Sequence, residues 1–81
     1  MNSEIPPRRL RWLCRRGMKE LDIVLGGYLD TCYPNASADE KAAFEALLQL
    51  EDPLIWSWLV GAEPLPEGKQ GDVVRRLIDR R

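Results

Sequence analysis

The sequence predicts an all-α fold, a compact single-domain bundle of about five short helices spanning residues 1–81. Apolar residues recur at spacings of three and four, and no segment alternates with a period of two for long enough to form a strand. Glycines and prolines divide the chain into segments of about one helix each. Hydrophobic residues make up 44% and charged residues 31% of the chain, which is the balance of a folded domain with one small core.

Residues 1–6 carry no periodicity, so we expect a flexible tail there. Pro7 suits the first position of a helix, where its missing N–H leaves no hydrogen bond unmade, and this helix should continue to Arg16. Gly17 should end the helix, because glycine accepts the left-handed conformation that is common after a helix. The apolar face of this helix comprises Leu10, Leu13 and Cys14.

A second helix, from Met18 to Cys32, is expected at the centre of the core. Gly26 and Gly27 each cost this helix about 1 kcal/mol relative to alanine, so either another helix approaches closely there or the helix bends. The segment Tyr33-Pro34-Asn35 should close it. The apolar face comprises Met18, Leu21, Leu25, Tyr28, Leu29 and Cys32.

Ser37 and Glu40 predict the start of a third helix through a capping box. In this motif the serine side chain accepts from the Glu40 N–H, and the glutamate returns to the serine N–H. The helix should run to Leu50 and turn Glu40, Lys41 and Glu45 towards water. Its buried face comprises Ala43, Phe44, Leu47 and Leu48.

Asp52 and Pro53 predict a fourth helix, with the aspartate as N-cap and the proline at the first helical position. This helix should reach Val60, and residues 61–68, which include two prolines and two glycines, should form a loop. A last helix is expected over residues 69–80, with Arg75, Arg76 and Arg80 outward. The residues expected to be buried are Leu54, Ile55, Trp58 and Leu59 in the fourth helix and Val73, Val74, Leu77 and Ile78 in the last.

The chain has no histidine, which removes the commonest general base and the commonest metal ligand. A catalytic triad, a zinc finger and a two-histidine metal site are therefore excluded. Cys14 and Cys32 fall on different helices, and we expect both to be reduced thiols that behave as small buried hydrophobes. The alternative is a reactive thiol at Cys14, whose pKa would be lowered by Arg15 and Arg16.

The longest apolar runs fall far short of the roughly 20 residues that span a bilayer, and the N-terminus lacks a signal-peptide pattern. We therefore expect a soluble cytoplasmic protein without membrane insertion. The formal net charge is −1, yet six of the twelve basic residues crowd the first 19 positions, while most acids lie between Asp30 and Asp72. The basic end could contact nucleic acid or an acidic protein surface, and charge alone leaves both open.

The segment from Arg15 to Asp22 is the candidate functional surface. Arginines at the end of one helix and Glu20 in the first turn of the next complement the helix dipoles, so a structural role explains them equally well. Trp12 is the tryptophan that we expect at an interface, as an anchor flanked by arginines. Trp58 should belong to the core, and Trp56 should be partly exposed.

Two blocks of sequence resemble the SdhE/YgfY family of succinate dehydrogenase assembly factors. The first block is Trp12-x-Cys14-Arg15-Arg16-Gly17-Met18-x-Glu20-Leu21-Asp22, which contains the family's R-G-x-x-E motif at Arg16, Gly17 and Glu20 and the following aspartate at Asp22. The second is Asp52-Pro53-x-Ile55-Trp56-x-Trp58-Leu59, preceded by Ser37-x-x-Glu40-Lys41. The resemblance covers about residues 8 to 80, and Gly26-Gly27 departs from the bulkier residues expected at those positions.

The resemblance implies a five-helix protein that binds the flavoprotein subunit of succinate dehydrogenase, and in some bacteria fumarate reductase. It implies a non-catalytic factor that promotes covalent attachment of FAD to a histidine of this client, so FAD is the client's cofactor and none is bound stably here. The contact would centre on Arg16, Gly17 and Glu20, supported by Trp12, Arg15 and Asp22. Arg15 and Arg16 would pair with client carboxylates or carbonyls, Glu20 would pair with a client cation or amide, and Gly17 would let the two chains approach closely.

Two other functions remain open at this point. The runner-up is a small helical nucleic-acid-binding or antitoxin-like regulatory module that uses Arg8 to Lys19 on phosphates. The acidic net charge and the lack of a clear recognition helix disfavour it. A flavin-binding protein in its own right is a third function, without a supporting motif. We expect a monomer that binds no metal.

Overall fold

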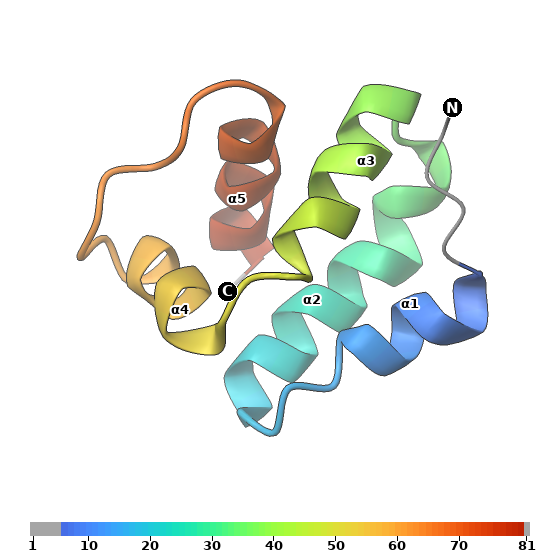
Figure 1. The fold of residues 1–81 in the computed structure, drawn as a ribbon, viewed down its shortest axis with the longest axis horizontal. Coiled ribbons are helices and arrows are strands. Elements are labelled where there is room, and N and C mark those ends of the chain that lie inside the picture. Colours follow the sequence, from blue (N-terminus) through green and yellow to red (C-terminus); the bar gives the residue numbers. More distant parts are fainter. Residues whose placement is uncertain (1–5, 81) are drawn as a thin grey trace.

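The structure is a computed structural model that describes residues 6–80 and contains five α-helices in that range (Figure 1). The helices are α1 (Pro7–Leu13), α2 (Lys19–Thr31), α3 (Ala38–Leu47), α4 (Asp52–Leu59) and α5 (Lys69–Arg80), with a 3₁₀ turn, η1, at Tyr33–Asn35. No strand occurs within the described residues, which confirms the all-α prediction. The tail expected at residues 1–6 lies outside them, apart from an exposed Pro6.

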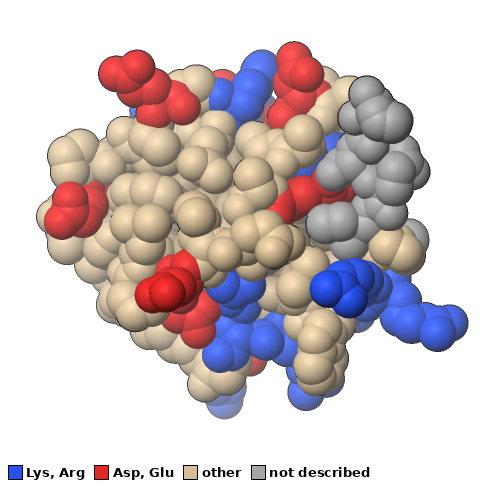
Figure 2. Space-filling view, in the orientation of Figure 1, with Lys and Arg blue, Asp and Glu red and all other residues tan. Residues whose placement is uncertain are grey.

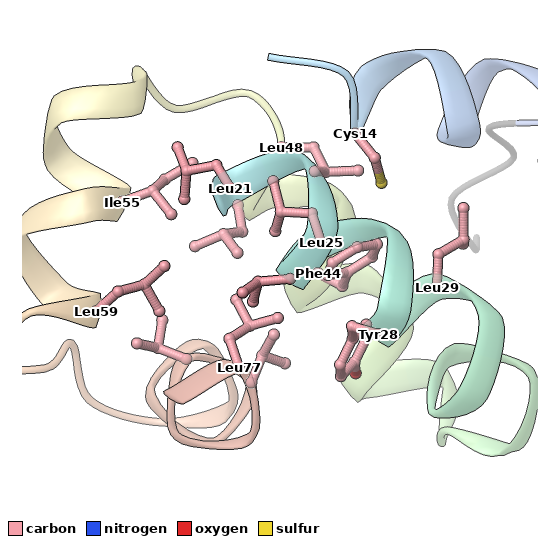
Figure 3. Close-up of a cluster of buried hydrophobic side chains, with 14 of the residues drawn as sticks. Cys14, Leu21, Leu25, Tyr28, Leu29, Phe44, Leu48, Ile55, Leu59 and Leu77 are labelled. Atoms are coloured by element: carbon pink, nitrogen blue, oxygen red, sulfur yellow. The ribbon is translucent and has the colours of Figure 1, made fainter. Parts of the chain in front are cut away.

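The helices surround a core to which all five contribute. α5 packs against α2, α3 and α4, while α1 lies along α2 on the other side of the molecule (Figure 1). Figure 3 shows side chains from α2, α3, α4 and α5 converging in the centre. The fully buried side chains include Leu21, Leu25, Tyr28, Phe44, Leu47, Ile55, Val73, Val74 and Leu77. The core predicted for these four helices is therefore largely confirmed.

Glu40 and Glu45 of α3 face the protein, and the prediction that both face water was wrong. The Ser37 Oγ accepts from the Glu40 N–H at 3.1 Å, as the capping box requires. The Glu40 carboxylate instead accepts from the Tyr28 hydroxyl at 2.6 Å and pairs with Arg76 at 3.3 Å. Glu45 is only 5% exposed and accepts from the Tyr33 hydroxyl, because the ring of this tyrosine packs beside α3 on Phe44.

Leu54 was also predicted wrongly, since it is 40% exposed rather than buried. α4 has only eight residues, and it turns Ile55, Trp58 and Leu59 inward, which leaves Leu54 at the rim. Two tryptophans are as expected: Trp58 is 8% exposed, and Trp56 is intermediate.

The glycine pair of α2 lies in an unbroken helix. A Cβ atom added to Gly27 would lie 3.2 Å from the guanidinium of Arg80, so the side chain of α5 makes the close approach there. Gly71 in α5 is tighter, because an added Cβ would lie 2.0 Å from the carbonyl oxygen of Pro66. The loop between α4 and α5 is thus packed directly onto the backbone of α5.

Candidate functional site

The segment between α1 and α2 is irregular over residues 14–18. α1 ends at Leu13, and the prediction that it reaches Arg16 was wrong by three residues. The Arg16 N–H donates to Asp22 Oδ1 at 2.6 Å instead of to a carbonyl of α1. Gly17 follows with φ of +84°, a left-handed conformation that glycine adopts without strain. We call residues 14–22 the corner.

Arg16 is the main tether of the corner. Its side chain is only 11% exposed and donates from Nε to Asp52 Oδ1 at 2.7 Å and from Nη1 to the carbonyl oxygens of Leu13 at 3.0 Å and Leu48 at 2.8 Å. A fourth bond runs from Nη2 to the carbonyl oxygen of Leu50. A charged group with this many internal partners is held in place by hydrogen bonds that would be costly to leave unmade.

The Asp52 side chain accepts a hydrogen bond from Arg16 of the corner and does not act as the N-cap of its own helix. It is the first residue of α4, and the N-cap position is taken by Glu51, which makes no side-chain capping bond. The N-cap predicted at Asp52 was therefore wrong by one position. Local sequence gave only a helix-start signal, and no local pattern points to a partner 36 residues away. Sequence reasoning consequently missed Asp52 as a residue of the site.

Cys14 is buried at the end of α1, with 3% exposure. Burial raises the pKa of its thiol to about 11, and this outweighs the smaller lowering by the Arg11 and Arg16 charges. The alternative of a reactive, low-pKa thiol is thereby contradicted, and the small buried hydrophobe is confirmed. Cys14 and Cys32 are both free cysteines, but Cys32 is only partly buried, so the prediction of a fully buried side chain was wrong for Cys32.

Trp12 is the most exposed large hydrophobic residue that the structure describes, at 68%. Two grooves border it, one lined by Pro6, Arg8 and Arg9 and the other by Arg8, Arg11 and Arg15. Figure 2 shows blue side chains gathered along the lower right of the molecule, where α1 lies in Figure 1. An exposed indole between arginines suits a protein partner with acidic side chains.

The six predicted site residues separate into two groups. Trp12, Arg15, Gly17 and Glu20 are exposed, and Glu20 lies in the first turn of α2, as expected. Arg16 and Asp22 are turned inward and hydrogen-bonded within the chain. The structure thus brings one group to the surface and uses the other to fix the shape of that surface.

The fold and the site define a small helical protein that presents a fixed, basic and aromatic surface. The described residues contain no group of three or more potential metal ligands among His, Cys, Asp and Glu. Within the same range, no helix is both long and apolar enough to cross a membrane. The exposed Trp12 and the arginines around it form the kind of surface that a protein-binding factor presents, and this is the class that the geometry fits best.

Comparison with known proteins gives the family. Residues 8–81 match the family described as "Flavinator of succinate dehydrogenase", and the chain belongs to it. The chain is 36% identical over 73 residues to the FAD assembly factor SdhE of Idiomarina loihiensis, covering 90% of this chain and 81% of the relative. It is 42% identical over 72 residues to that of Shewanella oneidensis, covering 89% and 88%. The relative from Coxiella burnetii is 36% identical over 80 residues, covering 99% and 96%. The resemblance noted in the sequence is confirmed.

Proposed function

We propose that this chain is an assembly factor that binds the flavoprotein subunit of succinate dehydrogenase and promotes covalent attachment of FAD to it. The family match over residues 8–81 carries this proposal. Relatives that are 36% to 42% identical to the chain over the aligned residues are named FAD assembly factors. The proposal extends to the flavoprotein of fumarate reductase and places the action in the cytoplasm.

In this proposal the exposed part of the corner touches the client. Trp12 inserts between client side chains, Arg15 pairs with a client carboxylate or carbonyl, and Glu20 meets a client cation or amide. Gly17 supports such contact, because a Cβ atom added there would have no neighbour within 4 Å. The client can therefore approach the Gly17 backbone on this side without meeting another side chain of this protein.

Arg16 and Asp22 play a different part from the one expected of a contact residue. Their hydrogen bonds to Asp52 and within the corner support a positioning role, in which they keep the exposed residues at fixed relative places. The factor would then act by binding one conformation of the client more tightly than others, which raises the population of that conformation. FAD and the flavin-accepting residue belong to the client, and the factor itself is not an enzyme.

The test is flavin attachment to the purified apo-subunit incubated with FAD and the factor. Covalent flavin is read as fluorescence of the denatured client in a gel. Trp12→Ala, Arg15→Ala and Glu20→Ala should each lower the rate of attachment, whereas Lys69→Ala, an exposed change on α5, should leave it unchanged. Equal covalent flavin with and without the factor would refute the function, and equal rates for all four variants would refute the site.

A further inference from the structure

The outer face of α2 carries a stripe of residues that the proposed function does not use. The stripe is formed by Lys19, Ile23, Gly26 and Asp30, which are separated by four, three and four positions and therefore lie along one side of the helix. Ile23 is 64% exposed in the middle of this side. An exposed isoleucine beside a glycine gives a knob and a hole on the same helix.

Gly26 has no explanation within the chain. Gly27 lies under the Arg80 guanidinium, but a Cβ added to Gly26 would meet nothing within 4 Å. A glycine inside a helix is unfavourable relative to alanine, and one recurrent use of such a position is close approach by another backbone or ligand. The missing side chain of Gly26 therefore leaves room for a group from outside this chain.

The charges of the stripe indicate that the group from outside this chain is α2 of a second copy. Lys19 and Asp30 lie at its two ends, at equal distances in sequence from the midpoint between Val24 and Leu25, and Ile23 and Gly26 flank the same midpoint. A two-fold axis through this midpoint places Lys19 opposite Asp30 of a second copy. The same axis places Ile23 over Gly26 of the second copy.

We propose that α2 packs antiparallel against α2 of a second copy of this chain, forming a two-fold symmetric dimer. A parallel pairing in register would bring lysine to lysine and aspartate to aspartate, so the charges select the antiparallel arrangement. Asp30 also pairs with Arg11 of its own chain, and both side chains are more than half exposed, so the incoming lysine joins an accessible pair.

One helix from each chain makes a small interface, below the roughly 1,200 Å² at which specific complexes become stable. The dimer is therefore weak and forms at high protein concentration, and the monomer expected from the sequence describes the dilute protein. The dimer uses Lys19, Ile23, Gly26 and Asp30 rather than Trp12, Arg15 or Glu20, so its failure would leave the proposed assembly function standing.

Sedimentation equilibrium of the full chain, up to millimolar concentration, tests the dimer. The parent chain should show reversible association, and Gly26→Leu should weaken it at least tenfold by filling the hole. Leucine has a higher helix propensity than glycine, so the variant should still fold, which circular dichroism checks. Ala42→Leu, which adds three carbons rather than four at an exposed site of α3, should leave association unchanged. A parent chain that stays monomeric throughout would overturn the proposal.

Charge reversal tests the orientation. Lys19→Glu and Asp30→Lys should each weaken self-association, because each puts like charges opposite one another at both ends of the dimer. An equimolar mixture of the two variants should associate more tightly than either alone, since every facing pair is then of opposite sign. A mixture that is no tighter than the separate variants would overturn the antiparallel arrangement.

Discussion

Arg16 Nε donates to Asp52 Oδ1 at 2.7 Å, which joins the corner between α1 and α2 to the first residue of α4. The same guanidinium bonds the carbonyl oxygens of Leu48 and Leu50 in the turn that connects α3 to α4. One side chain therefore fixes two connections of the fold that are far apart in sequence.

Arg16→Ala should lower the free energy of unfolding by about 2–4 kcal/mol, because it removes a charged donor and leaves Asp52 and three carbonyl oxygens without this partner. Arg15→Ala is the matched control: Arg15 is exposed, so its loss should change stability by less than about 0.5 kcal/mol. Urea unfolding of both variants gives the measurement. Equal stability losses for the two arginines would contradict the tether.

Gly17 should resist substitution for a conformational reason alone. Its φ of +84° is costly for other residues, and an added Cβ would meet no neighbour. Gly17→Ala should therefore cost about 1–2 kcal/mol of unfolding free energy. Gly17→Asn should cost less despite its larger side chain, because asparagine tolerates this conformation better. A larger loss for asparagine than for alanine would indicate steric crowding instead.

Alkaline pH should destabilise the protein through Cys14. Burial raises its pKa from the ordinary 9.0 to about 11, so the unfolded chain loses this proton first. Below pH 9 the thiol is protonated in both states, so its full contribution to the free energy of unfolding is present. As the pH rises from 9 to about 11, the free energy of unfolding falls by up to about 1.4 kcal/mol per pH unit for one such group. Tyr33, whose pKa burial raises to about 12, adds a loss of the same sign above pH 10.

Urea midpoints measured from pH 8 to pH 11 check this expectation. Cys14→Ala should reduce the slope between pH 9 and pH 11, although it also lowers stability at every pH by opening a small cavity. Leu10→Val perturbs the buried side of α1 without adding or removing a titrating group, so it should keep the slope. An unchanged slope in Cys14→Ala would assign the pH dependence to other groups.

Gly71→Ala should destabilise the fold although alanine is the better helix former. The added methyl group would lie 2.0 Å from the Pro66 carbonyl oxygen, and such overpacking typically costs about 1–3 kcal/mol. Gly26→Ala makes the same chemical change in α2 where space is open, so it should stabilise by about 0.5–1 kcal/mol. Thermal unfolding of the two variants should shift in opposite directions, and a shift in the same direction would contradict the contact.

The sequence predicted the helices well because their signals are local. Apolar residues recur with the helical period in α2, α3 and α5, and the Ser37 side chain does cap α3. The start of α2 shifted by one residue to Lys19, and the end predicted for α3 at Leu50 was wrong by three residues, because the helix ends at Leu47. Such boundaries depend on short-range hydrogen bonds, which a residue pattern reports directly.

The sequence failed where a distant partner decides the outcome. Arginines beyond Leu13 look like a favourable last helical turn, but the Arg16 N–H bonds Asp22 and its side chain reaches Asp52. Glu45 looks like a solvated side chain, yet it accepts from Tyr33 of η1. These hydrogen-bonded pairs depend on tertiary packing, so the local residue pattern does not predict them.

Residues 14–18 of the corner are irregular in backbone and yet tied to three helices by side-chain hydrogen bonds. Asp22 of α2 accepts from the Arg16 backbone, and the Arg16 side chain reaches Leu13 and Asp52 in α1 and α4. A segment held this way has little conformational entropy left to lose. Its binding to a partner would therefore not be weakened by the ordering that flexible loops must undergo, so a few exposed side chains can suffice for recognition.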